Sequence, residues 1–390
     1  MRNRILAALS WTTVLLIAAV LLAVSAFASR DPDSTVYAGI SARLSTMPLS
    51  AWLVPEWWGL WGLEGPFREH PVGIFILPAL LGRAGYPAEQ AAYAIGAVSS
   101  VLAVLLVGWV AAPLVRDHER AAVRWATLLL PIAFTYRIRA NQEYPVLVLL
   151  LAAVYATERA RTSAAWMAGI VAAAVGVFLM KGVFVVFVPI VCALWLLLSG
   201  RGDGRPDRSA WVGVGLATVA VVLAAVGYEA VYRSVSGDSF FAYYIAQRLG
   251  SNTGVGSEAS SVPGRAWNVP WYLARLIWFA VPGSLVLIGL ALRGRATRWR
   301  GAPGLAFPVG VALVYVIVMS LGANRADRFI FPAYFAIGVG GAVVAMRRWP
   351  GVERAARWIA HREPYGTPVL WLLLFLATFL TASRLPYVQF

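Results

Sequence analysis

Long apolar stretches alternate with short arginine-rich segments along this chain of 390 residues. The stretches run for about 15–24 residues, close to the roughly 20 that a helix needs to cross a bilayer. Hydrophobic residues make up 60% of the chain, above the level of about 45–50% that is usual in soluble domains. We therefore predict an all-α, polytopic membrane helical bundle that forms a single domain over residues 1–390.

The arginine-rich segments are "RDHERAAVR", "ERARTS", "GRGDGRPDRS", "RGRATRWR" and "RRWPGVERAARWIAHRE". Because Lys and Arg are enriched in cytoplasmic loops, these segments predict the topology. About eleven spans, with the N-terminus inside, place every one of them in the cytoplasm. The net charge of +15 is thus spread over loops rather than gathered on one face or tail, and we exclude a nucleic acid as partner.

The predicted spans are 5–27, 89–112, 121–136, 144–158, 163–180, 182–199, 210–229, 270–292, 303–321, 329–346 and 367–383. The run from Ile5 to Phe27 is longer than the apolar region of a usual signal peptide, so we interpret it as an uncleaved first span. This predicts a multi-pass protein of the cytoplasmic (inner) membrane. Segments 28–88, 137–143, 230–269 and 322–328 then lie outside.

Two of the outer segments are long. In the first, 28–88, the apolar stretch 71–83 is too short to cross the membrane and predicts an interfacial helix on or half-way into its surface. In the second, 230–269, the Gly/Ser-rich "GSNTGVGSEASSVPG" predicts a mobile piece. We expect this piece to act as a lid or a gate for substrate.

Several acidic residues are predicted at the outer ends of spans. Asp31 and Asp33 follow the first span, where each is either a solvated or helix-capping residue or a functional carboxylate. Glu69 and His70 in "FREHP" either bind a divalent metal, or orient each other for proton transfer, or form an interfacial polar pair. Two residues that are adjacent in the sequence are not a typical spacing for metal ligands, so a divalent metal is only a candidate cofactor.

Basic residues at the outer face run against the charge rule and are therefore candidates for binding an anion. They are Arg137, Arg139, Lys181, Arg325 and Arg328. A guanidinium can hold a phosphate with a two-pronged donor fork. Lys181 is the only lysine in the chain, and it either marks a turn with the glycine that follows or serves as a phosphate counter-ion. We expect these residues to converge on one anionic lipid headgroup.

The order of these short motifs resembles the GT-C membrane glycosyltransferases, especially the lipid A aminoarabinose transferases and bacterial protein O-mannosyltransferase-like proteins. In chain order the motifs are an aspartate after the first span, "YAGIS", "EHP", "QEYPV", "KG" and "FIFPAY". The resemblance covers residues 5–200 and, more loosely, 230–345. It implies an outer-face enzyme that moves a hexose or pentose from a polyprenyl-phosphate donor to a lipid, glycan or protein acceptor.

By position, the resemblance implies that Asp33 and Glu143 are catalytic and that Tyr37 belongs to the "YA" motif near the substrate. It matches Glu69 to the glutamate of a family "E-K-P-P" motif, and Lys181 to the lysine of "KG". The sequence departs from the pattern in three places: histidine replaces the lysine of "E-K-P-P", valine replaces its second proline, and segment 322–328 has no histidine. These departures leave the sugar and any use of metal open.

The residue types agree with this chemistry. A carboxylate can remove the acceptor proton, and cations can stabilise the departing phosphate. No nucleotide-binding G-x-x-x-x-G-K-[ST] loop occurs. The alternatives are a transporter or flippase for a lipid-linked or anionic substrate, and a non-catalytic scaffold. A transporter would carry charges near the middle of its spans, whereas only Arg275 falls clearly inside a predicted span.

Overall fold

The computed structural model describes residues 32–57, 64–137, 139–199, 207–249, 265–292, 303–322 and 324–362. Within these ranges the chain is helical, with one isolated backbone bridge between Glu56 and Pro66 and no strand. The predicted all-α class is confirmed for this part of the chain. The first and last predicted spans, Asp31 and the Gly/Ser-rich piece lie outside the described residues.

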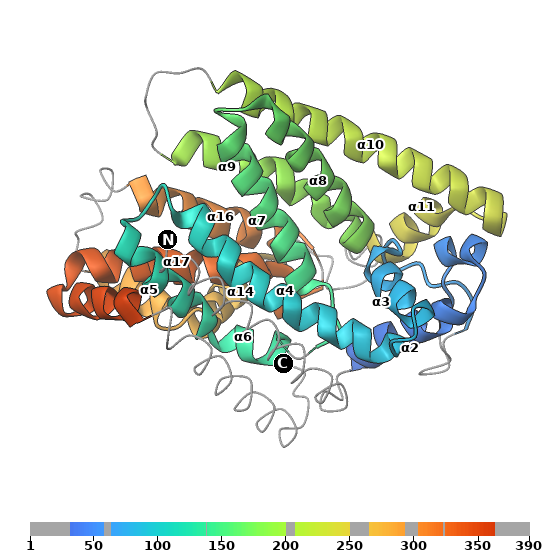
Figure 1. Cartoon of the computed structure of the whole chain (residues 1–390), viewed down its shortest axis with the longest axis horizontal. Coiled ribbons are helices and arrows are strands. Elements are labelled where there is room, and N and C mark those ends of the chain that lie inside the picture. Colours follow the sequence, from blue (N-terminus) through green and yellow to red (C-terminus); the bar gives the residue numbers. More distant parts are fainter. Residues whose placement is uncertain are drawn as a thin grey trace.

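Most of the long apolar helices run roughly along the longest axis of the molecule (Figure 1). They are α4 (Ala88–Ala111), α7 (Glu143–Ala160), α8 (Met167–Lys181), α9 (Phe187–Leu198), α10 (Arg208–Ser236), α16 (Pro303–Ser320) and α17 (Phe331–Arg348). α7 packs against both α4 and α8, and its Leu147, Leu150 and Val154 are buried. This packing builds the largest apolar core and fixes where the N-terminus of α7 lies.

Four helical stretches in the described part of the chain are long and apolar enough to cross a membrane: Ala88–Ala111, Ala164–Leu198, Arg208–Ser236 and Asp327–Arg348. The helices α14 (Asn268–Phe279) and α15 (Gly283–Leu292) add a fifth if the pair is one span. The helix α3 (Gly73–Arg83) and the stretch Leu305–Ser320 are apolar but shorter. The total of about eleven spans stays a prediction.

Two predicted spans are not continuous helices. Residues 121–136 form α5 (Asp117–Leu128) and α6 (Pro131–Tyr136). Pro131 has no N–H for the helical ladder and restricts the residue before it, which separates the two helices. The predicted span 270–292 is broken between α14 and α15, whose axes differ by 116°. Pro282 lies in that break, where it cannot donate the backbone hydrogen bond that would continue α14.

The stretch Ala164–Leu198 reverses direction near its middle. Gly182, between α8 and α9, has a φ of +57°, a backbone conformation that favours glycine. Arg161 lies just before the stretch and donates to Ser199 Oγ, just after it, over 3.1 Å. Because the two ends of the stretch meet at Arg161, α8 and α9 form a hairpin with Gly182 at its turn.

α2 (Pro32–Thr46) and α3 pack on each other at one end of the molecule, beside the short helix η1 (Leu49–Leu53) (Figure 1). We call this the α2 end. α3 also contacts α8 closely, since a Cβ on Gly73 would lie 2.7 Å from the Leu179 carbonyl oxygen. The first loop is therefore a set of packed helices that reaches the turn of the α8–α9 hairpin.

The second predicted outer segment, 230–269, is mostly helical over its described residues 230–249. The Gly/Ser-rich piece that we predict to be mobile lies outside the described residues. α10 continues to Ser236, and α11 (Phe240–Tyr243) and η5 (Tyr244–Leu249) follow. Arg68 from the first loop holds this region, donating to Tyr232 Oη at 2.8 Å and to Asp238 Oδ2 at 2.7 Å. Burial of Phe240 adds an apolar anchor.

Candidate active site

Asp33 lies in the first turn of α2 and forms an ion pair with Arg328, which belongs to η8 (Asp327–Ile330). Both side chains are about one-third exposed, at 35% and 37%. The next residue, Ser34, accepts a hydrogen bond through Oγ from the backbone N–H of Ala140 at 3.1 Å. The start of α2 is thus held against the turn before α7 and against η8, although these segments are far apart in the chain.

Lys181 and Glu143 form a second ion pair, with Lys181 Nζ 2.8 Å from Glu143 Oε1. Their side chains are only 6% and 1% exposed. Glu143 lies in the first turn of α7 and Lys181 in the last turn of α8, so each charge has the sign that its helix end favours. A buried charge left alone is strongly unfavourable, which makes the two side chains dependent on each other.

His70 lies beside these groups in an aromatic pocket. Its ring stacks on Phe75, and it meets the edges of Phe67 and Tyr37. Nδ1 lies 3.1 Å from the Pro71 carbonyl oxygen and Nε2 lies 3.1 Å from Tyr37 Oη. A carbonyl only accepts, so Nδ1 donates to Pro71 and Nε2 accepts from Tyr37.

Burial, together with the nearby charge of Lys181 and against the opposing bond to Pro71, lowers the pKa of His70 to about 4. The imidazole is therefore neutral near pH 7. Because both ring nitrogens are already engaged, His70 does not offer a lone pair to a metal in this arrangement. Glu69, its neighbour, is partly buried.

Arg275 and Asp327 form a third pair beside η8, with Arg275 Nε 3.4 Å from Asp327 Oδ1. Arg275 also lies over the Trp271 ring, 5.0 Å from its centroid. The charge of Arg139 acts on Asp327 as well, and Arg139 lies over the Tyr136 ring at 4.6 Å. Asp327 was not among the predicted residues, since an aspartate between two arginines in "RADR" is typical of a solvated loop.

Arg137 is placed differently from the other predicted cations. Its side chain is 1% exposed and its Nη2 donates to the Leu128 carbonyl at 2.7 Å, so it caps the end of α5. Its guanidinium also lies 5.2 Å from the centre of the Phe134 ring. Arg325 is exposed in the segment before η8. The structure therefore gathers Arg139 and Arg328 near η8, puts Lys181 with Glu143, and buries Arg137.

Asn141 and Gln142 precede Glu143 and are buried, at 5% and 7% exposure. In the described part of the chain, Asn141 Oδ1 and Gln142 Oε1 have no hydrogen-bond partner. Buried amide oxygens are almost always bonded in proteins, to protein, water or ligand. Gln142 belongs to the motif "QEYPV" and Asn141 directly precedes it, but the sequence alone gave no reason to separate these two amides from exposed loop residues.

An apolar groove of about 750 Å³ opens next to the Lys181 end of α8. Phe178, Gly182, Val222, Val226, Phe241 and Ile245 line it, together with residues from η4 (Gly182–Val186). Val222, Val226 and Ile245 are more than half exposed, so the groove faces outward from the bundle. Among the described residues that line it, only Glu229, Arg233 and Tyr244 carry a polar side-chain group.

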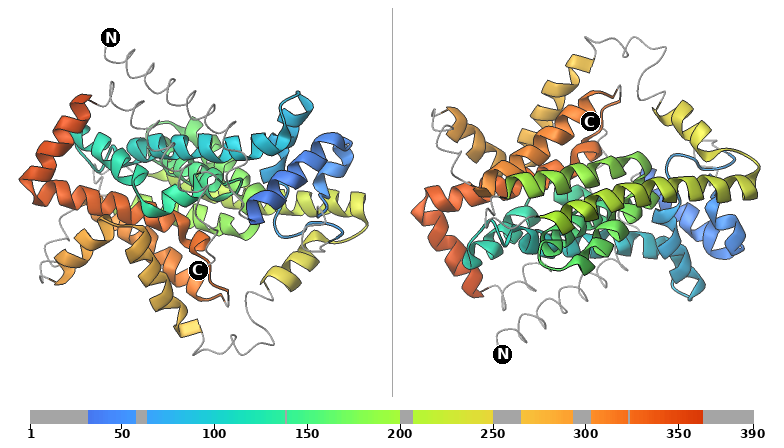
Figure 2. Two further views of the ribbon diagram at one scale, coloured as in Figure 1. Left: turned by 90° about the horizontal axis from the view of Figure 1, so that it is seen from below. Right: turned by 90° about the horizontal axis from the view of Figure 1, so that it is seen from above.

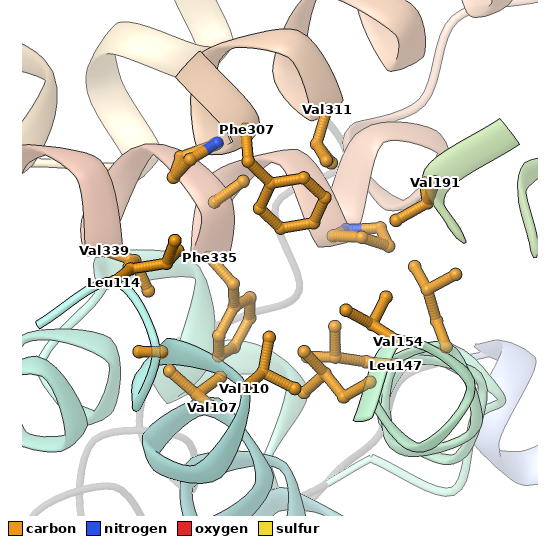
Figure 3. Close-up of a pocket in the computed structure, with 16 residues that line it drawn as sticks. Val107, Val110, Leu114, Leu147, Val154, Val191, Phe307, Val311, Phe335 and Val339 are labelled. Carbon is orange, nitrogen blue, oxygen red and sulfur yellow. The ribbon is translucent and has the colours of Figure 1, made fainter. Parts of the chain in front are cut away.

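A second, smaller cavity of about 60 Å³ lies inside the bundle (Figure 3). Phe307 and Phe335 face each other across it, with Val110, Leu147 and Val191 on the surrounding helices (Figure 3). Among the residues that the structure describes, only apolar side chains line it. Its size and lining give it no means to bind a charged substrate, and the α2 end is the candidate site.

No protein-family model and no curated protein match the chain. Solved structures do. ArnT from Cupriavidus metallidurans bound to undecaprenyl phosphate is 17% identical with a TM-score of 0.66, over 95% of this chain and 73% of ArnT. ArnT in the apo state matches with a TM-score of 0.67 and 17% identity, over 97% of this chain and 77% of ArnT.

A more distant match is AglB, an archaeal oligosaccharyltransferase from Archaeoglobus fulgidus, in complex with an inhibitory peptide and a dolichol-phosphate. It is 13% identical with a TM-score of 0.51, over 96% of this chain and 55% of AglB. The chain thus spans about half the length of AglB. ArnT and AglB share the GT-C architecture. This chain has the GT-C fold. The resemblance drawn from the sequence motifs is therefore confirmed at the level of the fold.

The sequence analysis named one candidate cofactor, a divalent metal. A further structure of the Archaeoglobus fulgidus oligosaccharyltransferase is a complex with Zn and sulfate. In the described part of this chain, no group of three or more His, Cys, Asp or Glu residues is arranged to hold a metal ion. Together with the engaged nitrogens of His70, this arrangement does not fit a metal centre at Glu69 and His70.

Proposed function

We propose that this protein is a glycosyltransferase that moves a sugar from a polyprenyl-phosphate donor to a lipid, glycan or protein acceptor at the outer face of the membrane. The observation that carries the proposal is the position of the apolar groove. Gly182 lines the groove, and the preceding residue is Lys181, the only lysine in the chain. A long prenyl chain suits the groove, and an ammonium suits the phosphate at its end.

Binding of the donor would use charges that are now paired with protein carboxylates. Lys181 is held by Glu143 and Arg328 by Asp33. A phosphate between these pairs would attract both cations. This supports roles for Lys181, Arg139, Arg325 and Arg328 in donor binding, with Tyr37, Glu69 and His70 shaping the site beside them. The buried Arg137 supports the site through α5.

The transfer step needs a base, and Asp33 is our candidate. Its carboxylate takes the proton of the acceptor hydroxyl while the acceptor oxygen attacks the anomeric carbon of the sugar. The bond between that carbon and the phosphate oxygen breaks, and polyprenyl phosphate leaves with the electron pair. Nearby cations stabilise the charge on the departing phosphate. Glu143 is the second proposed catalytic carboxylate, acting from its pair with Lys181.

A transporter or flippase is the second candidate. Among the described residues, the pairs Asp33–Arg328 and Glu143–Lys181 lie at helix ends, whereas Arg275 of the third pair lies within α14. A transport site is expected nearer the middle of the spans. The cavity within the bundle is apolar and small. Both observations favour the transferase.

The decisive experiment supplies purified protein with polyprenyl-phosphate donors that carry a hexose or a pentose, together with lipid, glycan and peptide acceptors. Sugar transfer with stoichiometric release of polyprenyl phosphate is the expected result. Lys181→Ala is the variant expected to lose donor binding. Movement of an intact lipid-linked sugar across a liposome, with no transfer to any acceptor, would contradict the proposal and favour the flippase.

A further inference from the structure

A helix of residues 350–362 follows α17 at the end of the molecule opposite α2. Figure 2 shows it as the red helix, which turns sharply away from α17 and runs across the end of the bundle. We call this helix, together with Arg348 and Trp349 that lead into it from α17, the basic end helix. Since α17 is long and apolar enough to cross a membrane, a helix that turns aside at its end is positioned to lie along the membrane surface.

Contacts with the turn between α4 and α5 fix the basic end helix in place. Glu353 Oε1 lies 3.2 Å from Arg116 Nη1 and 3.7 Å from His118 Nε2. Arg347, at the end of α17, donates to the Leu114 carbonyl at 2.7 Å. Ala356 is 1% exposed and faces the protein. The opposite side of the helix is therefore presented to the surroundings in a fixed orientation.

Two arginines on this element are available to a ligand. Arg348 and Arg354 are exposed, and neither forms an ion pair within the ranges described. The other two arginines of the helix are partly used: Arg357 pairs with Glu353 at 2.7 Å, and Arg362 lies over the Trp358 ring. Among the described residues, Arg348 and Arg354 therefore give the exposed side positive charge that no carboxylate pairs with.

Exposed indoles accompany these charges. Trp358 is 58% exposed and Trp349 is 38% exposed. Tryptophan is enriched where hydrocarbon meets headgroups, and arginine is enriched on the cytoplasmic side of spans. The combination within one short segment, residues 348–362, matches a lipid surface, which offers a phosphate layer beside an apolar layer. An acidic protein surface would complement the arginines but would leave both indoles without an apolar partner.

We propose that the basic end helix is a binding site for acidic phospholipid headgroups in the cytoplasmic leaflet. Arg348 and Arg354 donate hydrogen bonds to the lipid phosphate, and Trp349 and Trp358 insert at the level of the headgroups. This site lies at the far end of the bundle from the candidate active site. The proposal does not depend on the transferase activity.

The chain offers a clean way to test this. Cys192 is its only cysteine and is buried. Ala355→Cys therefore places a single accessible thiol on the exposed side of the basic end helix. An environment-sensitive fluorophore on this thiol is measured in nanodiscs of phosphatidylcholine, with and without phosphatidylglycerol. In parallel, native mass spectrometry measures how many phosphatidylglycerol and how many phosphatidylcholine molecules stay bound to the protein.

We expect a blue-shifted, less water-exposed probe in discs that contain phosphatidylglycerol, and selective retention of that lipid. Arg348→Gln and Arg354→Gln should each weaken the preference by about fivefold. The matched control is Arg208→Gln, an exposed arginine in the first turn of α10 that is not on this helix.

Two results would overturn the proposal. One is a probe spectrum that is the same in both kinds of disc. That result would leave an acidic protein as the partner for these arginines. The other is an equal loss of lipid preference in Arg208→Gln, which would mean that overall positive charge, rather than the basic end helix, retains the lipid.

Discussion

Asp33 and Arg328 are separated by almost the whole described chain, and their side chains form an ion pair at the α2 end. The pair joins α2 to η8 and keeps the Asp33 carboxylate beside a guanidinium, partly open to solvent. A carboxylate held in this way is poised for exchange, because an incoming phosphate can take over the guanidinium. The proposed base would then be released only when the donor is bound.

The first prediction concerns Asp33. Asp33→Asn keeps the shape of the side chain and removes its basicity, so turnover should fall by roughly 10²–10⁴-fold, the loss that is typical of a general base. Donor binding should change little. Sugar transfer from a purified donor measures this, with Asp31→Asn as the matched control. Near-normal turnover in Asp33→Asn with a large loss in Asp31→Asn would assign the base to Asp31 instead.

The second prediction concerns the buried pair of Lys181 and Glu143. Lys181→Ala leaves the Glu143 carboxylate buried without its partner, so the free energy of unfolding should fall by about 3–5 kcal/mol. Lys181→Arg keeps the charge and should lose less. Thermal or chemical unfolding in detergent measures the stability, and binding of a labelled polyprenyl phosphate measures the donor affinity.

A double variant separates stability from function at this pair. Lys181→Met with Glu143→Gln removes both charges, so most of the lost stability should return. Donor affinity should stay low, because the ammonium is still missing. Recovery of donor affinity in the double variant would mean that Lys181 acts only as the structural partner of Glu143.

The sequence predicted which charged residues belong to the candidate site, but not which of them form ion pairs with each other. The sequence singled out Asp33, Glu143, Lys181 and Arg328 because charged residues at the outer face of the membrane are unusual and because their motifs resemble those of the GT-C family. It could not predict which acid meets which base, since the pairs depend on how α7 packs against α8 and how η8 reaches α2. Asp327 was missed for the same reason: only the fold brings it to Arg275.

The fold class was predictable from the spacing of apolar stretches, whereas the continuity of single helices was not. Pro131 and Pro282 mark the two places where predicted spans are broken, and both signals were present in the sequence. Hydropathy alone passes over them because the flanking residues are apolar on both sides. Buried Phe240 and the bonds from Arg68 explain why the outer segment begins as helices that pack against the first loop, which its sequence did not reveal.

The third prediction tests the hairpin turn beside the groove. Gly182 has a φ of +57°, and a Cβ there would lie 2.7 Å from Tyr244 Oη. Gly182→Ala should therefore lower the free energy of unfolding by about 2–5 kcal/mol, through backbone strain and overpacking together. It should also weaken donor binding, because the groove begins at this residue.

Gly237→Ala is the control for this substitution. Gly237 also has a positive φ, of +75°, but a Cβ added to it would have no atom within 4 Å. It should lose only about 1–2 kcal/mol from backbone strain. Tyr244→Phe removes the hydroxyl and should restore part of the stability of Gly182→Ala. No recovery in that double variant would show that strain at Gly182, rather than contact with Tyr244, decides the loss.

The last prediction concerns pH and His70, whose pKa is lowered to about 4 by burial, from the usual 6.5. The folded state keeps the ring neutral, whereas the unfolded state binds a proton below pH 6.5. His70 therefore costs no stability above about pH 6.5, and stability is lost as the pH falls from 6.5 towards 4, by up to about 3 kcal/mol. Unfolding measured across this range should show a shallower slope for His70→Gln than for the wild type. His361→Gln, which alters an exposed histidine, should keep the wild-type slope, and an unchanged slope in His70→Gln would mean that other groups set the acid sensitivity.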